Sequence, residues 1–456
     1  MVPVHNEEAR LPRCLDEFAR YASKAEHDIE VIVAEDGSTD RTLDIAKEYG
    51  RKYHFVKIVS SKVRLGKGGG ILNGIDASSG DIVLYMDVDM AVTLDQIPRF
   101  VDEILKGADV AIGSRTHPYS IVHKPPFHRI FLGRLFNILV RFMFRLGYFD
   151  TQVGFKAFKR KTLVDIIRQT NTDGFAFDVD VLIKSEIMGY KVREVPITWA
   201  HKRGSKISPI KNAYEMFFDL IRIKLELLAN KRFTLLGRKE YKEFYDRIAG
   251  DVYHRAERSF FLPRRAWHVR KNREILQEIP GEAEHVLDLG SGSGNLTLKI
   301  ALARPRALVT GIDIGKSFVK YSAQYSKKVG ATNIDFIEGD INALPIREKF
   351  SPVVVVSEVL EYVPHQKSAL AEINRVMKNQ GLLILTTPRV GLRWAIIRAI
   401  WTLVRREKLE IPYFPLNLSR LRFLILGTGF YPLKLKVMNM GCTLLMTAVK
   451  VASRIT

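Results

Sequence analysis

The chain has 456 residues, of which 46% are hydrophobic and 27% are charged, an ordinary balance for folded domains that excludes a disordered, collagenous or coiled-coil protein. At this length roughly two to four domains are expected. Its two cysteines, Cys14 and Cys442, exclude a disulfide framework and a Cys-rich zinc site, and fit a reducing compartment. With 71 Lys and Arg against 50 Asp and Glu, the net charge is +21, which favours polyanionic partners such as nucleic acid, anionic lipid or phosphorylated substrates.

The apolar runs of the chain bear on its relation to membranes. None reaches the length of about 18 uncharged residues that a conventional spanning helix needs. The first residues, MVPVHNEEAR, lack the basic and apolar regions of a signal peptide. Only Met1 and Val2 precede the first recognisable motif, so the first strand is expected to be short or to begin before the residues given.

Two α/β patterns follow one another along the chain, over residues 1–230 and 245–456. In the first, strand-like runs alternate with helical stretches, which predicts a parallel sheet. The clearest of these runs are 30–35, 81–87 and 109–114. The second pattern has strand-like runs at 285–290, 308–313, 334–340, 353–358 and 381–388. The basic stretch 231–244 lacks strand signals and is predicted to be a linker between two α/β domains.

Two carboxylates, Asp87 and Asp89, stand at the end of one apolar strand. Alternation along a strand points both to one side, with Val88 opposite. Such a pair can hold a hard divalent cation, Mg²⁺ or Mn²⁺, which would neutralise a diphosphate, and a solvated turn is the alternative. The loops PVHNEE (3–8) and EDGSTD (35–40) follow two earlier strands and should reach the same sheet edge, where ligands bind in open α/β sheets.

On these motifs the first half resembles the family 2 glycosyltransferases of the GT-A fold, with His5 in place of their usual Tyr. Further stretches look like the dolichyl-phosphate hexose synthases, and Ala91 is typical of their glucosyl branch. These stretches are LGKGGGILNGI (65–75), GSR (113–115), DTQVGFKAF (150–158), FAFDVDVL (175–182) and RGSK (203–206). The resemblance implies transfer of a hexose, with glucose favoured, from a nucleotide sugar such as UDP-glucose to dolichyl or polyprenyl phosphate.

The same resemblance implies roles for single residues, with Asp87 and Asp89 holding the metal and the diphosphate. Arg115 and Arg129 would meet the acceptor phosphate. That phosphate is already an anionic nucleophile, so orientation and charge neutralisation should carry the rate. Asp178 stands where related transferases place a base-like carboxylate, and hydrogen bonding within the site is the alternative. The residues implied for nucleotide-sugar binding are Pro3, His5, Glu7, Asp36, Lys67, Arg203 and Lys206.

Two stretches, 130–147 and 394–406, have the pattern of amphipathic helices with arginines beside a broad apolar arc. Such a helix is typical of a bilayer interface, and a core helix with solvated arginines is the alternative. Residues 214–228 are a weaker third candidate. The first pattern is carried by Arg134, Leu135, Phe136, Leu139, Arg141, Phe142, Met143, Arg145 and Leu146. The second is carried by Trp394, Ile396, Ile397, Arg398, Ile400, Trp401, Leu403, Val404 and Arg405.

In the second half, VLDLGSGSGNL (286–296) is an apolar strand that runs into a Gly-rich turn and then a helix. The glycines would permit a tight turn and close approach of a ligand. Asp313 ends the next strand, where a carboxylate can accept both ribose hydroxyls, and Asp340 ends a third. With VSEVLEYV (356–363) and RVMKNQGLLILTTP (375–388), these features resemble the class I S-adenosylmethionine-dependent methyltransferases.

This second resemblance implies a Rossmann-like domain that binds S-adenosylmethionine. Asp288 would lie near the methionine amine, Asp313 on the ribose, and Asp340 and Ile341 at the adenine. The glycines implied for the turn are Gly290, Gly292 and Gly294. The candidates for the base that an O-methyl transfer would want are Glu358, Glu361 and His365. For each of these three, a place on a helix face is the simpler interpretation.

Together these features predict a bifunctional enzyme that is peripheral on the cytoplasmic face of a membrane and contacts its surface without spanning it. The first half would transfer the hexose, and the second a methyl group, with a lipid-linked sugar as one candidate acceptor. One alternative is a nucleic-acid-binding methyltransferase with a degenerate glycosyltransferase scaffold. Another is a soluble glycosyltransferase with a different acceptor. A nucleic-acid partner is not expected, because no zinc knuckle, RNA-recognition motif or basic–aromatic strand platform is visible.

Overall fold

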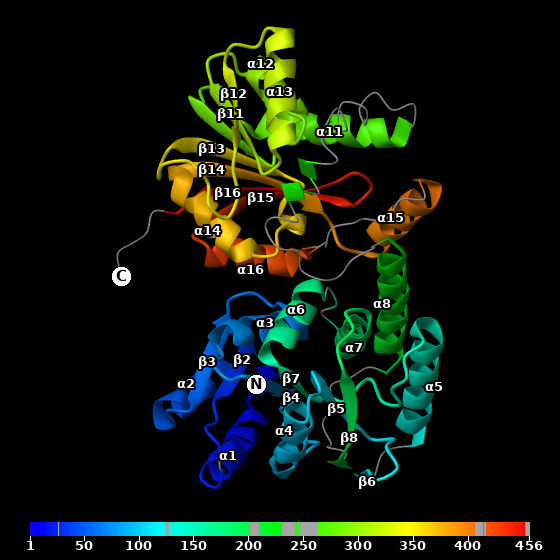
Figure 1. Ribbon diagram of the computed structural model, residues 1–456. Coiled ribbons are helices and arrows are strands. Elements are labelled where there is room, and N and C mark those ends of the chain that lie inside the picture. Colours follow the sequence, from blue (N-terminus) through cyan, green and yellow to red (C-terminus); the bar gives the residue numbers. More distant parts are fainter. Residues whose placement is uncertain are drawn as a thin grey trace. The chain divides into compact units, whose positions relative to one another are not determined.

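The computed structural model divides the chain into two compact units, Met1–Ala229 and Asn230–Thr456 (Figure 1). The residues described are 1–25, 27–123, 127–170, 172, 174, 176–200, 209–229, 242–243, 245–246, 262–405, 414 and 416–451. The predicted linker, 231–244, lies almost entirely outside these residues. Each unit has its own sheet and its own hydrophobic cores, so each is considered by itself.

The strands of the first unit form a three-stranded set and a four-stranded set, and a hydrogen bond joins the two sets at their edges. Three parallel strands are ordered β1–β2–β3, with bounds Val2–Val4, Val31–Asp36 and Val56–Ser61. A second set is ordered β4–β7–β5–β8, with bounds Ile82–Met86, Phe155–Lys159, Val110–Ser114 and Val192–Pro196. The amide of Met86 donates to the carbonyl oxygen of Met1 at 3.0 Å and joins β1 to β4. Strand β7 runs antiparallel to both β4 and β5, so the predicted parallel sheet is in fact mixed.

Helices cover both faces of this sheet, which explains why a central strand such as β2 is buried along its whole length. In β2, Val31 and Val33 pack into a core that includes Leu11 and Leu15 of helix α1, whereas Ile32 and Ala34 pack with Ile71 of α3. The helices are α1 (Leu11–Ala22), α2 (Thr42–Lys52), α3 (Gly66–Ala77), α4 (Ile97–Leu105), α5 (Phe127–Phe144), α6 (Arg160–Gln169), α7 (Phe177–Ile187) and α8 (Pro209–Ala229). A short 3₁₀ turn, Leu94–Gln96, and the parallel pair β6 (Ile121–His123) and β9 (Thr198–Ala200) complete the unit.

Helix α5 contains most of the first stretch predicted to lie on a membrane, and part of its apolar arc is buried. Val140 is fully buried in a cluster with Val179 of α7 and Leu220 of α8. Ile138 and Phe142 remain exposed, at 62% and 84%. Within the described parts of the chain, no helix combines the length and the apolar character needed to cross a membrane.

The second unit has one seven-stranded sheet in the order β12–β11–β10–β13–β14–β16–β15 (Figure 1). The first five strands are parallel, and β16 runs antiparallel to both β14 and β15. The strands in chain order are β10 (His285–Leu289), β11 (Leu308–Asp313), β12 (Ile334–Glu338), β13 (Ser351–Ser357), β14 (Met377–Pro388), β15 (Phe430–Met438) and β16 (Thr443–Lys450). The helices are α11 (Leu262–Glu278), α12 (Asn295–Ala303), α13 (Lys316–Val329), α14 (Gln366–Val376), α15 (Leu392–Arg405) and α16 (Leu418–Gly427), with the 3₁₀ turn η2 (Leu360–Tyr362).

Two cores, one on each face, flank this sheet. Val286 packs with Ile275 of α11 and Ile300 of α12, whereas its neighbour Leu287 packs with Ile373 of α14. The strand order reverses between β11 and β13, on either side of β10. Ligands of open α/β sheets bind at the carboxyl ends of the strands beside such a reversal, so the fold itself indicates where the site should lie.

Candidate active sites

In the first unit, the two loops predicted to converge are bound to each other. The carboxylate of Asp36 accepts the amide hydrogens of Leu65 and Gly66, at 2.5 and 2.9 Å, where α3 begins. His5 Nδ1 lies 2.8 Å from the carbonyl oxygen of Asp36. Burial raises the pKa of Asp36, and the two amides oppose that rise. The carboxylate therefore holds the loop before α3 in place.

The neighbouring loop residues are fixed in the same way. The amide of Glu7 donates to Thr42 Oγ1 at 2.7 Å, and its carboxylate pairs with Arg10. Asn6 takes the left-handed conformation, with φ 55°, and accepts the amide hydrogen of Thr39 at 2.8 Å. Pro3 lies in β1, beside Ala34 of β2. These contacts bring Pro3, His5, Glu7 and Asp36 to one edge of the sheet.

A charged cluster lies at the end of β4. Lys67 Nζ lies 3.1 Å from Asp87 Oδ1 and 2.7 Å from Asp178 Oδ2. The other oxygen of Asp178 accepts hydrogen bonds from Lys156 Nζ at 2.7 Å and the Tyr85 hydroxyl at 2.9 Å. Asp178 therefore has a donor on each side, and Lys67 bridges it to the first carboxylate of the D-x-D pair.

The electrostatics of this cluster bear on the role of Asp178. Burial acts to raise the pKa of Asp178, but Lys156 and Lys67 outweigh it and lower the pKa to about 2. Desolvation within the cluster raises the pKa of Asp87, although one side of its carboxylate stays open to solvent, and Lys67 opposes that rise. A carboxylate with a pKa near 2 is a weak proton acceptor at neutral pH. The geometry thus favours the hydrogen-bonding role for Asp178 over that of a base.

The D-x-D pair has the orientation that strand alternation predicts. The Asp87 side chain is 51% exposed, and Val88 between the two carboxylates is buried. Asp89 Oδ1 accepts the amide hydrogen of Ala91 at 3.0 Å. Among the described residues, no group of three or more His, Cys, Asp or Glu side chains could hold a metal ion. Two carboxylates still fit Mg²⁺, because such sites commonly draw their remaining ligands from substrate phosphates and water.

Gly154 hydrogen-bonds and packs closely against Asp87, a contact that the sequence did not predict. The amide of Asp87 donates to the Gly154 carbonyl oxygen at 3.0 Å. A β-carbon at residue 154 would lie 2.0 Å from Asp87 Oδ2, so only glycine leaves room for this carboxylate. The signal was present in the sequence, since Gly154 is the glycine of DTQVGFKAF.

Among the arginines and the lysine predicted to bind phosphate, the structure describes the side chain of Arg115 but not the others. Arg115 makes a two-pronged ion pair with the buried Asp150, at 2.7 and 3.0 Å, and its guanidinium lies 5.6 Å from the ring centre of Trp199. Asp150 contributes to raising the pKa of Arg115, which stays charged. Arg129 lies in α5, but its side chain is outside the described part. The predicted residues outside the described part altogether are Arg203 and Lys206.

In the second unit, the Gly-rich turn connects β10 to α12. Gly290, Gly292 and Gly294 have φ of 73°, 53° and 74°, values that favour glycine. The amide of Gly292 donates to Asp313 Oδ2 at 2.8 Å, and the amide of Gly315 donates to Oδ1 at 2.9 Å. Asp313 thus holds the Gly-rich turn against the end of β11.

The ends of β11 and β12 lie side by side as predicted. The amide of Gly339 donates to the Asp313 carbonyl oxygen at 2.9 Å. Asp340 Oδ1 accepts the amide hydrogen of Asn342 at 2.9 Å, and Ile341 is half-buried against the core. Asp313, Asp340 and Ile341 are therefore brought to the edge that carries the turn.

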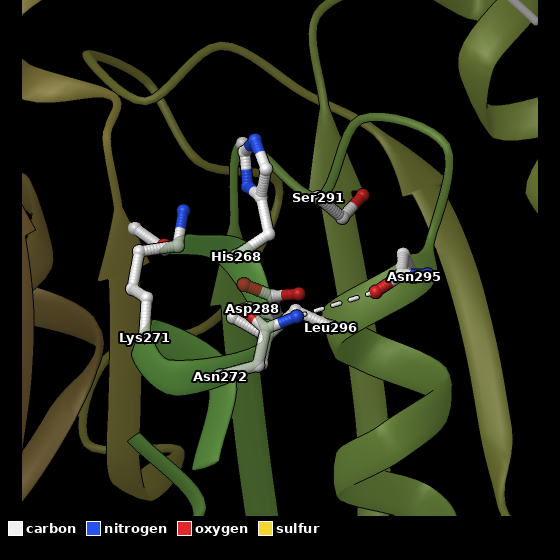
Figure 2. A pocket seen from close by; sticks show the side chains of 9 residues that line it. His268, Lys271, Asn272, Asp288, Ser291, Asn295 and Leu296 are labelled. Atoms are coloured by element: carbon white, nitrogen blue, oxygen red, sulfur yellow. Dashed lines mark hydrogen bonds between the residues drawn. The ribbon is translucent and has the colours of Figure 1, made fainter. Parts of the chain in front are cut away.

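A pocket opens where β10 meets the Gly-rich turn (Figure 2). Its lining residues are His268, Lys271, Asn272, Asp288, Gly290, Ser291, Asn295, Leu296 and Ser357. Asp288 is buried and accepts the Thr297 hydroxyl at 2.7 Å, and burial raises its pKa to about 7. No group in the described part of the chain hydrogen-bonds the buried Ser291 Oγ. An unpaired buried hydroxyl in a polar pocket beside a glycine turn fits a site for a polar ligand such as S-adenosylmethionine.

Helix α11 supplies residues that sequence reasoning did not assign to the site. His268, Lys271 and Asn272 line the pocket from this helix (Figure 2). Asn272 Nδ2 donates to Asn295 Oδ1 at 3.3 Å and ties α11 to the start of α12. The basic sequence of α11 contains no motif that would have singled them out.

Comparison with known proteins follows the division into two units. A family model described as "Glycosyl transferase family 2" matches residues 1–167. The dolichyl-phosphate beta-glucosyltransferase of Mus musculus is 34% identical over 247 residues, covering 50% of this chain and 75% of the relative. That of Dictyostelium discoideum is 32% identical over 241 residues, covering 50% of this chain and 74% of the relative. The chain belongs to glycosyl transferase family 2. The predicted family and the glucosyl branch of its relatives are thereby confirmed.

A second family model, described as "Methyltransferase domain", matches residues 280–409. Solved structures similar to this chain include the magnesium protoporphyrin IX methyltransferase from Synechocystis PCC 6803, at 18% identity and a TM-score of 0.37, covering 47% of this chain and all of that one. A SAM dependent methyltransferase from Aquifex aeolicus matches at 16% identity and a TM-score of 0.34, also over 47% of this chain. The two family models and the glucosyltransferase relatives identify the chain as an enzyme with a glycosyltransferase domain and a methyltransferase domain, as the sequence predicts.

Proposed function

We propose that the first unit transfers glucose from UDP-glucose to dolichyl or polyprenyl phosphate, and that the second transfers a methyl group from S-adenosylmethionine to a lipid-linked sugar. The observation that carries the first proposal is the Lys67–Asp87–Asp178 cluster at a strand end, in a chain whose relatives are dolichyl-phosphate beta-glucosyltransferases. The domain bounds we propose are 1–230 and 245–456, joined by a linker at 231–244.

The D-x-D pair supports a nucleotide-diphosphate donor. A divalent cation, Mg²⁺ or Mn²⁺, would be held by Asp87 and Asp89 and would neutralise the diphosphate. Lys67 already lies beside Asp87 and is 22% exposed, so its ammonium is placed to meet the same negative charge. Pro3, His5, Glu7 and Asp36 line the neighbouring loops and would bind the base and ribose, and Arg203 and Lys206 the diphosphate.

The acceptor side needs orientation more than proton transfer. A lipid phosphate is an anionic nucleophile, and the depressed pKa of Asp178 leaves that carboxylate a poor base. Arg115 is held rigidly by Asp150 and Trp199, and an immobilised guanidinium matches a phosphate well. Arg115 and Arg129 are accordingly our candidates for holding the acceptor phosphate.

Three features support contact with the cytoplasmic face of a membrane. The net charge is +21, which favours anionic lipid. In α5, Ile138 and Phe142 are exposed, and in α15, Ile396 and Ile400 are exposed at 41% and 50%. Trp394 is less suited to insertion than the sequence indicates, because its ring lies 5.7 Å from that of the buried Trp267.

In the second unit, the pocket and the strand ends beside it would hold the methyl donor. The polar lining at Asp288 suits the methionine ammonium. The strand ends at Asp313 and Asp340, beside the Gly-rich turn, suit the ribose and adenine. The donor supplies an electrophilic methyl group, and the chain's contribution is to align donor and acceptor. A lipid-linked acceptor is favoured because a fused glucosyltransferase would make one and tethering would raise its effective concentration.

The test supplies the purified chain with labelled UDP-glucose, polyprenyl phosphate and Mg²⁺, and measures label in the lipid extract. We expect a lipid-linked, acid-labile glucose that disappears with a chelator and in Asp87→Asn with Asp89→Asn. For the second unit, Asp313→Ala should weaken S-adenosylmethionine binding by about 1–3 kcal/mol in calorimetry. Transfer that persists in the double variant, or unchanged donor affinity in Asp313→Ala, would contradict the corresponding half of the proposal.

A further inference from the structure

Glu361, in the 3₁₀ turn η2 after β13, has a fully buried carboxyl group. In the described part of the chain, too few hydrogen-bond donors surround it to stabilise its ionised form. Among the described residues, no group hydrogen-bonds its Oε1 atom, Oε2 has a long contact, 3.3 Å, with the Thr387 hydroxyl, and the residue's own backbone amide also acts on the carboxyl group. A buried carboxylate normally accepts several hydrogen bonds or faces a cation. Burial, and then the neighbouring Glu358, raise the pKa of Glu361 to about 8, so the group is mainly protonated at neutral pH.

Its surroundings connect it to the pocket. Glu358 Oε2 lies 2.6 Å from Lys271 Nζ, and Lys271 lines the pocket from α11. Lys271 acts on Glu361 as well, in the direction that favours ionisation. The other titratable groups of the lining are Asp288 and His268. Lys271 thus pairs directly with Glu358 and acts electrostatically on Glu361 and Asp288.

The backbone of Glu358, at the end of β13 beside the pocket, has an unfavourable conformation. Glu358 has φ 57°, in the left-handed region that a residue with a β-carbon enters at a cost. Residues held in such conformations cluster at functional sites, where the surrounding structure compensates the strain. Here the ion pair with Lys271 fixes the side chain at the strand end, next to the pocket residue Ser357.

We propose that Glu361 is the proton store of the methyl-transfer site. It holds a proton when the pocket is empty or contains the neutral thioether product, and it is ionised when the pocket contains the positively charged methyl donor. Through this exchange the pocket distinguishes donor from product by charge. The inference rests on the proposed use of S-adenosylmethionine by this unit.

Because Glu361 takes up a proton during the transfer, the methyl acceptor is a group that loses one, namely a hydroxyl. In the transfer, the O–H bond of the acceptor breaks, its oxygen forms a bond to the methyl carbon, and the electron pair of the broken S–CH₃ bond stays on sulfur. The proton ends on Glu361. A positive sulfur and a negative carboxylate become neutral together, so the net charge of the site is unchanged.

Proton release on binding tests the proposal without any acceptor. Calorimetry of the full chain with S-adenosylmethionine and with S-adenosylhomocysteine, in buffers of different ionisation enthalpy, counts the protons released. At pH 7.5, Glu361 should contribute a measurable fraction of a proton for the donor and almost none for the product. Since ionisation of Glu361 favours the donor, donor affinity should rise with pH and level off above about pH 8.

The variant Glu361→Gln separates the alternatives, because an amide is close in shape to the protonated carboxyl it replaces. It should release markedly fewer protons at pH 7.5, bind the product as the parent does, and bind the donor about tenfold more weakly at pH 8.5. Glu372→Gln, which removes an α14 carboxylate paired with Arg375, should match the parent in all three.

Two results would overturn the proposal. One is equal proton release for donor and product in the parent chain, a measurement that needs no variant to fold. The other is a Glu361→Gln variant that binds the donor normally and releases the parent's number of protons. Both leave methyl-donor binding intact. A parent chain that binds neither molecule would instead contradict the proposed function of the unit.

Discussion

Lys156 Nζ lies 2.7 Å from Asp178 Oδ1, and the lysine side chain is completely buried. Lys156 is therefore the permanent counterion of Asp178. Lys67, which bonds the other oxygen of Asp178, is partly exposed. We expect Lys67 to be able to turn toward a diphosphate without leaving Asp178 uncompensated, because Lys156 stays in place.

Replacing Lys156 by Met should destabilise the first unit by about 3 kcal/mol in denaturant unfolding. That is the lower end for a broken buried ion pair, since Lys67 remains beside Asp178. Lys159→Met, in the same strand β7, breaks an ion pair with Asp109 whose lysine is 44% exposed, and should cost at most about 1 kcal/mol. Equal losses in the two variants would contradict the role of Lys156.

Gly154→Ala should impair glucosyl transfer while changing the free energy of unfolding little. The new methyl group would push the exposed Asp87 carboxylate from its position, and a small misplacement in a site can cost about 100-fold in rate. The measurement is the rate of lipid-linked glucose formation. Gly147→Ala, where no atom lies within 4 Å of the added carbon, is the control and should keep the parent rate. A Gly154→Ala enzyme of full activity would show that Asp87 need not stay where it lies.

The double variant Ile138→Ser with Phe142→Ser should bind anionic liposomes more weakly in flotation, because both side chains are exposed on α5. Leu105→Ser, at a position 70% exposed on α4, controls for lost apolar surface elsewhere and should bind as the parent does. If both variants bind equally well, α5 is not the part of the first unit that meets lipid.

The thermal unfolding midpoint of the second unit should fall as the pH rises from about 4.5 to 8. Burial raises the pKa of Glu361 to about 8 and that of Asp288 to about 7. A group whose pKa is raised in the folded state stabilises the fold fully below its unfolded pKa, and this stabilisation is lost as the pH rises through the folded pKa. Glu361→Gln should flatten the upper part of the curve. A midpoint that does not change over this range in calorimetry would contradict the shifted values.

Sequence reasoning located the strand ends because they combine two independent patterns. The apolar run before Asp87 requires a strand buried on both faces, and the alternation through Val88 then fixes the side to which the carboxylates point. In the second unit, the apolar run before Gly290 predicts a buried strand, and the closely spaced glycines predict the tight turn that follows it. Both patterns are local, so they can be read without knowledge of the fold.

Other features depend on packing between distant segments, which local patterns do not contain. The pairing of Lys156 with Asp178 joins β7 to α7, and an isolated buried lysine in a strand gives no sign of its partner. The pocket role of Lys271 depends on where α11 packs against the sheet. Helical periodicity predicted an apolar arc through Leu139 and Met143, but it does not say whether lipid or a neighbouring helix covers that arc.

The central claim, that the two units act on one lipid-linked sugar, is tested most directly with two labels. The full chain receives polyprenyl phosphate, UDP-glucose labelled in the sugar, and S-adenosylmethionine labelled in the methyl group. We predict that both labels enter one lipid-extractable, acid-labile product, and that the methyl label is absent when either UDP-glucose or polyprenyl phosphate is withheld. Methyl label that enters a product without UDP-glucose, or that never enters the lipid phase while glucose does, would contradict it.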